Sequence, residues 1–199
     1  NEKFKKSVQT ITYAPHFLSK DVLVGMMTAM LSPKNGIVNE FIKLLGKEPI
    51  YFMAEANWFK TVYVWSGIWQ NTGWNSIIYM AALAGIDPQL YEAAIVDGAS
   101  KWQRMWNITI PGILPTAITL LILNTGRIMN VGFEKVFLMQ NGLNLTSSEV
   151  ISTYVYKAGL IGAEYSFSAA VGLFNSIINF ILLITVNKIS RKTTETSLW

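Results

Sequence analysis

The sequence predicts an all-α integral membrane protein, a bundle of about four transmembrane helices with a cytoplasmic loop at its centre. Three uncharged stretches, residues 61–86, 105–126 and 165–187, are long enough to cross a bilayer, which takes about 20 residues. Only 14% of the 199 residues are charged, whereas a soluble domain carries about 25% charged residues. A soluble bundle of buried helices is disfavoured because the last stretch is apolar on every side of a helix.

A fourth span is predicted near the start of the chain. It contains Lys20 and Asp21, which are adjacent in sequence and therefore do not share a helix face. Basic residues favour a cytoplasmic position for both chain ends and the central loop by eight to six over the other loops. The chain begins without methionine, so we expect one transmembrane domain over residues 1–199 whose N-terminal part is missing. The predicted spans are 11–31, 61–86, 110–130 and 165–187, with the central loop at 87–109.

Composition excludes several classes of function. Without cysteine the chain has no disulfide, thiolate zinc site or cysteine nucleophile, and its one histidine, His16, cannot form a multi-histidine metal site. We interpret His16, which follows a proline at the start of a span, as a structural residue. A net charge of +4, spread evenly, is too small for a nucleic-acid interface. Membrane lipid is the partner that the composition favours.

The central loop carries the signals of a helix-turn-helix. Asp87 is a good N-cap, and Pro88 suits the first helical position, where its missing N–H costs nothing. Gly98 provides a left-handed stop, and Ser100 with Gln103 fits a capping box that starts a second helix. These signals suit a docking surface, and they suit equally a connector that returns the chain to the membrane.

A longer motif favours docking. Residues 92–94 read Glu-Ala-Ala, a glycine follows after three residues, and residues 108–111 read Ile-Thr-Ile-Pro. This pattern resembles the EAA loop of permease subunits in binding-protein-dependent ABC importers, although the family usually has leucine at the position of Ile110. In that family the loop docks on a separate ATPase. The residues to which the resemblance assigns this coupling role are Glu92, Ala93, Ala94, Asp97 and Gly98.

The resemblance extends along almost the whole chain. The run 97–100 is typical of carbohydrate importers of the maltose type, and segments such as 13–17 and 130–133 resemble the polysaccharide-type permeases. The resemblance implies about six spans in the complete protein and a multi-pass position in a bacterial inner membrane. It also implies a second, different permease subunit, two ATPase subunits, an extracytoplasmic solute-binding protein and a carbohydrate substrate. The chain lacks a phosphate-binding loop motif, so ATP and Mg²⁺ are expected on the ATPase and no cofactor on this chain.

Two groups of polar residues inside the spans are candidates for the substrate path. The first contains Trp69, Gln70, Asn71 and Asn75, whose aromatic and amide side chains suit sugars. Helix packing is an equal alternative for its three amides, and Trp69 could be an interfacial anchor. The second group, in the region where the family binds sugar, contains Asn124, Arg127, Asn130 and Phe133.

Arg127 has two interpretations. An intramembrane guanidinium should face the bundle interior, either paired with a carboxylate such as Glu134 or free to bind an anionic ligand. The second interpretation would make acidic oligosaccharides plausible substrates. A different class of function, an ion-coupled transporter or channel, would need ionisable pairs at the midplane or inverted repeats, and neither is evident. A membrane enzyme would need an acid–base cluster, which is also not evident.

Overall fold

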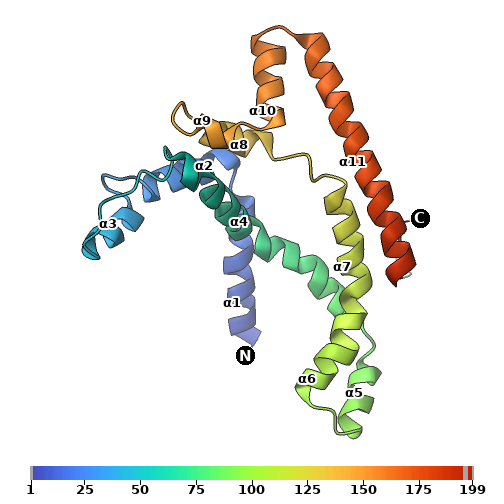
Figure 1. Cartoon of the computed structure of the whole chain (residues 1–199). Helices are drawn as coiled ribbons and strands as arrows, with labels where there is room; N and C mark the ends of the chain where they lie inside the picture. The colour runs from blue at the N-terminus through green and yellow to red at the C-terminus, as the bar shows by residue number, and fades with distance from the viewer. Residues whose placement is uncertain (1, 195–196, 199) are drawn as a thin grey trace. The chain divides into compact units, whose positions relative to one another are not determined.

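The computed structural model describes residues 2–194, 197 and 198, and these residues form helices joined by turns and loops, with no strand among them (Figure 1). The all-α class predicted from the sequence is therefore confirmed. The chain divides into two compact units, one of residues 1–74 and 130–172 and one of residues 75–129 and 173–199. The two long helices α4 (Ala56–Ala84) and α11 (Tyr165–Thr194) contribute to both units.

The first unit contains short helices around the first part of α4. Three of them are α1 (Glu2–Tyr13), α2 (Lys20–Met30) and α3 (Ile37–Leu44). The chain re-enters this unit at residue 130. It then forms α8 (Phe133–Met139), α9 (Leu145–Ser148), α10 (Ile151–Tyr156) and a π-helical turn, Lys157–Ile161.

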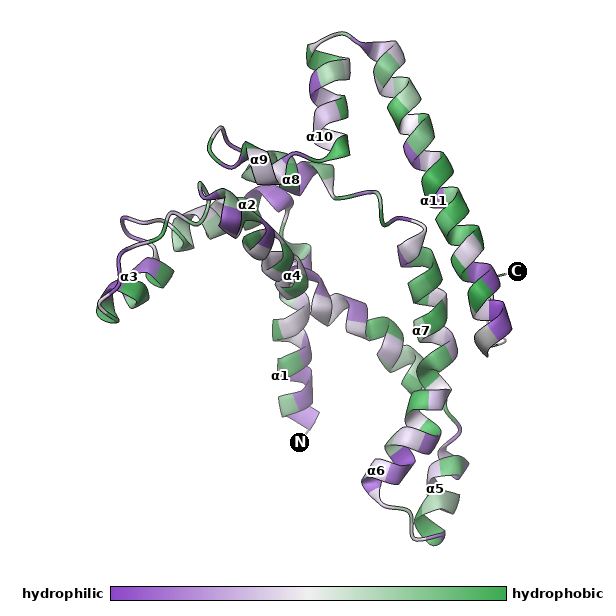
Figure 2. Ribbon diagram, viewed as in Figure 1, coloured by the Kyte–Doolittle hydropathy of each residue, from purple (hydrophilic) through white to green (hydrophobic). Residues whose placement is uncertain are grey.

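The second unit contains the central loop and the helix that follows it. The loop forms α5 (Pro88–Val96) and α6 (Lys101–Arg104). A π-helical turn, Met105–Thr109, then continues α6 into α7 (Ile110–Thr125). Two helical runs, Lys101–Thr125 and Tyr165–Lys192, are long and apolar enough to cross a membrane. Figure 2 shows that hydrophobic residues dominate α7 and the middle of α11.

The first predicted span, 11–31, is wrong as a single helix. A 3-10 turn, Ala14–Phe17, separates α1 from α2. Pro15 causes the break because it cannot donate a backbone hydrogen bond and its ring restricts the residue before it. Ser19 then starts α2 as an N-cap, and its Oγ accepts a hydrogen bond from the Val22 amide at 3.3 Å.

The other helix boundaries also differ from the predicted spans. The helix expected at 110–130 begins earlier, at Lys101, and ends at Thr125, where Gly126 follows and the amide of Arg127 bonds back to Asn124 in a tight turn. The helix expected at 61–86 begins at Ala56 and ends at Ala84. The last helix continues past the predicted limit of 187.

The first unit has a small apolar core. Val24 of α2, Phe59 of α4, and Val136 and Met139 of α8 are buried together, and α8 packs on α2. Phe59 is only 6% exposed and Val136 is 1% exposed. The packing of these four side chains stabilises the unit and holds α8 against the start of α4.

Two buried asparagines hold the loops of the same unit. Asn39 is fully buried, and its Nδ2 donates to the carbonyls of Leu31, Ser32 and Ile50 at 2.9–3.1 Å. Its Oδ1 accepts from the Ile50 amide at 2.8 Å. Asn144 similarly donates to the carbonyl of Met53 at 2.9 Å and joins two segments that are 91 residues apart. Each amide satisfies backbone groups that no helix or strand would satisfy.

In the second unit, α7 packs on α11 through small and polar contacts. A Cβ on Gly126 would lie 2.6 Å from Leu183 Cδ1, so this position requires glycine for the close approach. The Met129 amide donates to Asn179 Oδ1 at 3.3 Å. Asn179 therefore bonds to this same chain just beyond the end of α7, which is consistent with a role in helix packing.

We expect Asn39→Ala to lower the free energy of unfolding by about 2–3 kcal/mol, because it leaves buried backbone groups without partners. Glu40→Ala, one residue on, removes only the exposed ion pair with Lys43 and should cost less than about 0.5 kcal/mol. Thermal unfolding followed by tryptophan fluorescence in detergent checks both variants. Equal destabilisation by the two changes would contradict the role given to Asn39.

Candidate functional site: the central hairpin and the polar face of α4

The central loop folds as a helical hairpin that begins as the sequence predicts. Asp87 Oδ1 accepts a hydrogen bond from the Gln89 amide at 2.9 Å, and Pro88 occupies the first turn of α5. At the second helix the Ser100 amide donates to Gln103 Oε1 at 2.7 Å, and the Gln103 amide donates to Ser100 Oγ at 3.3 Å. Both caps are therefore confirmed.

Gly98 makes the turn between the two helices. Its φ is +76°, a left-handed conformation that side chains with a Cβ rarely adopt. The Ala99 amide donates to the Ala94 carbonyl at 2.9 Å and the Gly98 amide to the Ile95 carbonyl at 3.1 Å, the two bonds of a Schellman cap. A Cβ at Gly98 would have no neighbour within 4 Å in the described part of the chain. The positive φ of Gly98 is as expected, and the position of its absent side chain is open.

A contact that the sequence did not indicate ties the hairpin to the helix beyond it. The hydroxyl groups of Tyr91 in α5 and Thr109 in the π-helical turn lie 2.9 Å apart, within hydrogen-bonding distance. The predicted loop ended at residue 109, yet residues 101–125 form one continuous helical run through this turn. A short polar contact and a continuous helical run therefore connect α5 to α7.

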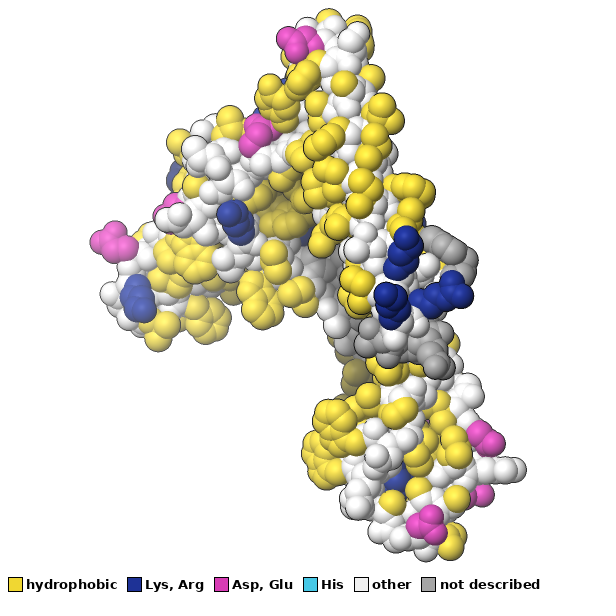
Figure 3. Space-filling model, turned by 45° about the vertical axis from the view of Figure 1, so that its right-hand side comes forward, with side chains coloured by type: hydrophobic (Ala, Val, Ile, Leu, Met, Phe, Trp, Pro, Cys, Tyr) yellow, Lys and Arg dark blue, Asp and Glu magenta, His cyan; other side chains and the backbone are white. Residues whose placement is uncertain are grey.

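The outer surface of the hairpin combines acidic and apolar side chains. Glu92, Ala93 and Asp97 are exposed, and Ala94 is half-buried. Several large apolar side chains are also exposed, with Val96 at 86% and Trp102 at 70%. Figure 3 shows hydrophobic side chains at the surface of the molecule beside a few acidic groups. Exposed aromatic and aliphatic groups rimmed by charge are typical of a docking surface.

The amides predicted in the middle of α4 are bound by their own chain. Gln70 is 1% exposed, its Oε1 accepts from Lys20 Nζ at 2.6 Å, and its Nε2 donates to the Leu18 carbonyl at 2.9 Å. Asn71 donates to the Gly67 carbonyl at 2.9 Å. The packing alternative thus describes both residues. Asn75 is exposed and falls in the other unit.

His16 has the structural surroundings expected of it. Its ring stacks on Trp74 with centroids 4.5 Å apart and planes 3° from parallel, and its Nδ1 lies 3.3 Å from Asn71 Oδ1. The ring of Phe17 meets Trp74 edge-on at 5.4 Å. These contacts attach the 3-10 turn to α4.

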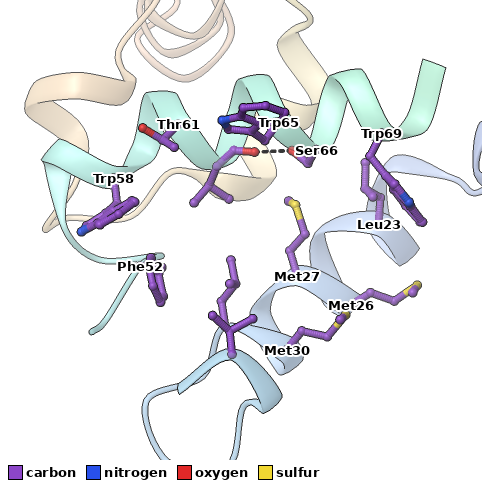
Figure 4. A pocket seen from close by; sticks show the side chains of 13 residues that line it. Leu23, Met26, Met27, Met30, Phe52, Trp58, Thr61, Trp65, Ser66 and Trp69 are labelled. Carbon is purple, nitrogen blue, oxygen red and sulfur yellow. Dashed lines mark hydrogen bonds between the residues drawn. The ribbon is translucent and has the colours of Figure 1, made fainter. Parts of the chain in front are cut away.

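Trp69 lies on a different face of α4, where it lines an apolar cavity of about 530 Å³ (Figure 4). Trp58 and Trp65 of α4 and Met26 and Met27 of α2 line the same cavity. Its two hydroxyl-bearing residues offer little to a sugar, and one of them, Ser66, already donates its hydroxyl to the Val62 carbonyl. Such a lining suits hydrocarbon better than a sugar, which needs several hydrogen-bonding partners. The structure therefore separates Trp69 from the amides next to it in sequence.

The second predicted group lies at and beyond the end of α7. Asn124 is in the last helical turn and Arg127 follows it, and both side chains are exposed. Asn130 and Phe133 fall in the other unit, and Phe133 packs 5.1 Å from Tyr156 as the first residue of α8.

The helical spacing that was expected to bring Arg127 near Glu134 is not observed, and the two residues fall in different units. Among the described residues the ion pairs are Lys43 with Glu40 and Lys157 with Glu149, each at 2.8 Å. The prediction assumed a helix through residue 130, whereas the helix ends before Arg127, so helical spacing does not bring the two groups together. Both interpretations of Arg127, a structural ion pair and an anionic ligand, stay predictions.

Lys20 and Lys135, which were not among the predicted site residues, both contact α4 through hydrogen bonds. Lys135 of α8 is 6% exposed, and its Nζ donates to the Tyr63 carbonyl at 2.8 Å and lies 4.6 Å from the centre of the Tyr63 ring. Burial, and to a smaller extent the charge of Lys20, lower the pKa of Lys135 to about 8. Nothing in the sequence marks Lys135, because it lies in a polar segment far along the chain from α4.

Comparison with known proteins gives consistent matches. Residues 4–195 match the family described as binding-protein-dependent transport system inner membrane component. The chain is 43% identical to Protein LplB of Bacillus subtilis over 95% of its own length and 59% of the relative. It is 41% identical, over 98% of its length and 61% of the relative, to the polygalacturonan/rhamnogalacturonan transport system permease protein YteP of the same organism.

A solved structure is also similar. A chain in the crystal structure of a bacterial alginate ABC transporter, in complex with an alginate pentasaccharide-bound periplasmic protein, superposes with a TM-score of 0.95 at 40% identity. The match covers 100% of the present chain and 69% of that chain. The present chain spans about three fifths of the length of LplB and YteP.

We expect the stability of the protein to rise with pH between about 8 and 10.5 through Lys135. The folded pKa is about 8 and the ordinary value is 10.5, so the unfolded chain holds more protons in this window and deprotonation favours the folded state. Melting temperatures measured from pH 7 to 10.5 for wild type and Lys135→Met check this. The difference, wild type minus variant, should increase with pH, and parallel curves would contradict the assignment.

Proposed function

Because the chain belongs to the family of binding-protein-dependent transport system inner membrane components, we propose that it is the permease subunit of an ATP-driven importer of oligo- or polysaccharides. The observation that carries the proposal is the hairpin of α5 and α6, which presents Glu92 and a left-handed Gly98 on an exposed, partly apolar surface. The polysaccharides handled by YteP and by the alginate transporter support a carbohydrate as the substrate class.

In the proposed mechanism the hairpin docks on a separate ATPase. Glu92 meets basic groups of the ATPase, and Gly98 allows its surface to approach the turn closely. When the ATPase changes conformation, α5 moves and pulls α6 and α7 through the contact between Tyr91 and Thr109. Residues 101–125 form one helical run with Pro115 inside α7, and the movement is carried along this run.

The substrate would pass residues near the end of α7 during alternating access. Exposed Asn124 and Arg127 can donate hydrogen bonds to sugar hydroxyl and carboxylate groups, and Asn130 and Phe133 follow them in sequence. We assign no catalytic residue and no bound cofactor to this chain. ATP and Mg²⁺ would bind to the separate ATPase, which hydrolyses the ATP.

The proposed assembly contains a second, different permease subunit, two ATPase subunits and an extracytoplasmic binding protein. A multi-pass position in a bacterial inner membrane agrees with the family description and with the two apolar helical runs. The basic residues near the end of α11 would face the cytoplasm by the positive-inside rule.

We expect Glu92→Lys and Gly98→Asp each to reduce copurification of the ATPase with the complete permease pair at least tenfold. The first reverses a charge in the interface, and the second places a charged side chain where the ATPase approaches the turn. Gly46→Asp is the matched control, because Gly46 has a φ of +73° and equally open space but lies outside the hairpin. Undiminished copurification and transport in Gly98→Asp, or equal loss in Gly46→Asp, would contradict the coupling role.

We expect Arg127→Gln to reduce oligosaccharide uptake in proteoliposomes at least tenfold while the complex assembles normally, because the guanidinium contacts the substrate. Lys47→Gln, another exposed cation, serves as the control. If uptake returns when Glu134 is neutralised as well, Arg127 acts through a structural partner and the substrate contact is refuted.

A further inference from the structure

The apolar cavity beside α4 has the shape of a slot. Its floor contains Leu23 of α2 and Phe52, which are buried. Its rims contain Met26 of α2 and Trp65 of α4, which are exposed. Leu23 is 1% exposed and Trp65 is 67% exposed, so the slot is narrow at the floor and open at the rims. All the residues that line it belong to the first unit.

The slot runs along α4 for about the depth of one membrane leaflet. Figure 4 shows Trp58 towards one end of the slot and Trp69 towards the other. These residues are eleven positions apart, and at about 1.5 Å per residue they are separated by about 16 Å along the helix axis. The hydrocarbon core of a bilayer is about 30 Å thick, so one leaflet contributes about 15 Å. With the central loop in the cytoplasm, as the basic residues predict, α4 begins at the outer surface and the slot spans the outer leaflet.

The outer end of the slot offers hydrogen-bond donors to a lipid. Trp58 and Thr61 lie near the start of α4 and line the slot. In the part of the chain that the structure describes, neither the Trp58 indole N–H nor the Thr61 hydroxyl has a hydrogen-bonding partner. Both groups can donate to an ester carbonyl, and tryptophan is enriched at membrane–water interfaces for this reason. Deeper in the slot, the Ser66 hydroxyl is already bonded to the Val62 carbonyl.

The shape of the slot suits a methylene chain better than a helix. A helix with its side chains is about 10–12 Å across, so it would rest on the rims at Met26 and Trp65 without filling the floor at Leu23. A single methylene chain can reach the floor and gain dispersion contacts with both walls. The wall contributed by α2 also contains Met27 and Met30. Methionine side chains adapt to an irregular apolar ligand because they are unbranched and polarisable.

We propose that this slot binds one acyl chain of an outer-leaflet phospholipid, with the ester group of the lipid beside Trp58 and Thr61. The bound chain packs between α2 and α4 and so stabilises the first unit, because a ligand that binds only the folded state raises its stability. This lipid site is separate from the hairpin of α5 and α6, and it does not rest on the proposed transport activity.

The test uses the complete permease pair, purified in detergent and mixed with two molecules per permease of a phosphatidylethanolamine whose acyl chain carries a diazirine. After irradiation, mass spectrometry locates the labelled residues. We expect strong labelling of Met27 and Trp65, which line the slot. Val22 and Ile68, exposed on the same two helices but outside the slot, should carry at least fivefold less label. Excess unlabelled phosphatidylethanolamine should remove this difference.

Two variants give a second readout. Thr61→Trp fills the slot near its outer end and should lower the labelling of Met27 at least fivefold. Val64→Trp, at an exposed position of α4 outside the slot, is the matched control and should leave this labelling unchanged. The wild-type measurement needs no substitution, so it decides the question even where Thr61→Trp does not fold.

Each other outcome overturns the inference. Equal labelling inside and outside the slot shows surrounding lipid only, and labelling confined to Val22 and Ile68 shows that another protein segment covers the slot. Labelling that oleate displaces as readily as phosphatidylethanolamine shows a fatty-acid site, and no labelling at any position shows that the lipid does not bind. None of these outcomes bears on the proposed function, which ATPase copurification and sugar uptake test separately.

Discussion

Every backbone amide and carbonyl in an apolar setting needs a hydrogen-bonding partner, and this requirement shapes the structure from end to end. Within α4 and α11 the helix supplies those partners itself, and in α7 it does so except at Pro115, which has no N–H to donate. Where helices stop, side chains take over: Ser19, Asp87 and Ser100 cap the following helices, and Asn39 binds four backbone groups of the neighbouring loop. The short helices and turns of the first unit persist because such side chains complete their hydrogen bonding.

The same requirement for backbone hydrogen bonds explains how the hairpin of α5 and α6 is closed and how it continues into α7. Its turn is closed by a Schellman cap at Gly98, and its second helix continues into α7 without losing a hydrogen-bonded turn. A π-helical turn keeps the chain helical while it shifts the register of the side chains. Thr109 of this turn lies within hydrogen-bonding distance of Tyr91, so the hairpin and α7 share a direct contact.

On α4, the neighbouring residues Trp69 and Gln70 make different contacts because their side chains lie on different faces of the helix. Trp69 faces an apolar cavity with Trp65, whereas Gln70 is buried against Lys20 and Leu18. The result is one helix with an apolar face and a face that carries two lysines.

The sequence by itself determined the helical class, the caps at Asp87 and Ser100 and the left-handed turn at Gly98, because these features depend on residues within five positions of each other. It could not locate the break at Pro15 or the end of α7 at Thr125. An apolar stretch is compatible with several helix boundaries, and the local residues do not distinguish between them. Only the tertiary structure decided that Lys135 meets Tyr63 across 72 residues and that Tyr91 meets Thr109. Such contacts depend on which helix faces pack together, and no local pattern of residues encodes that.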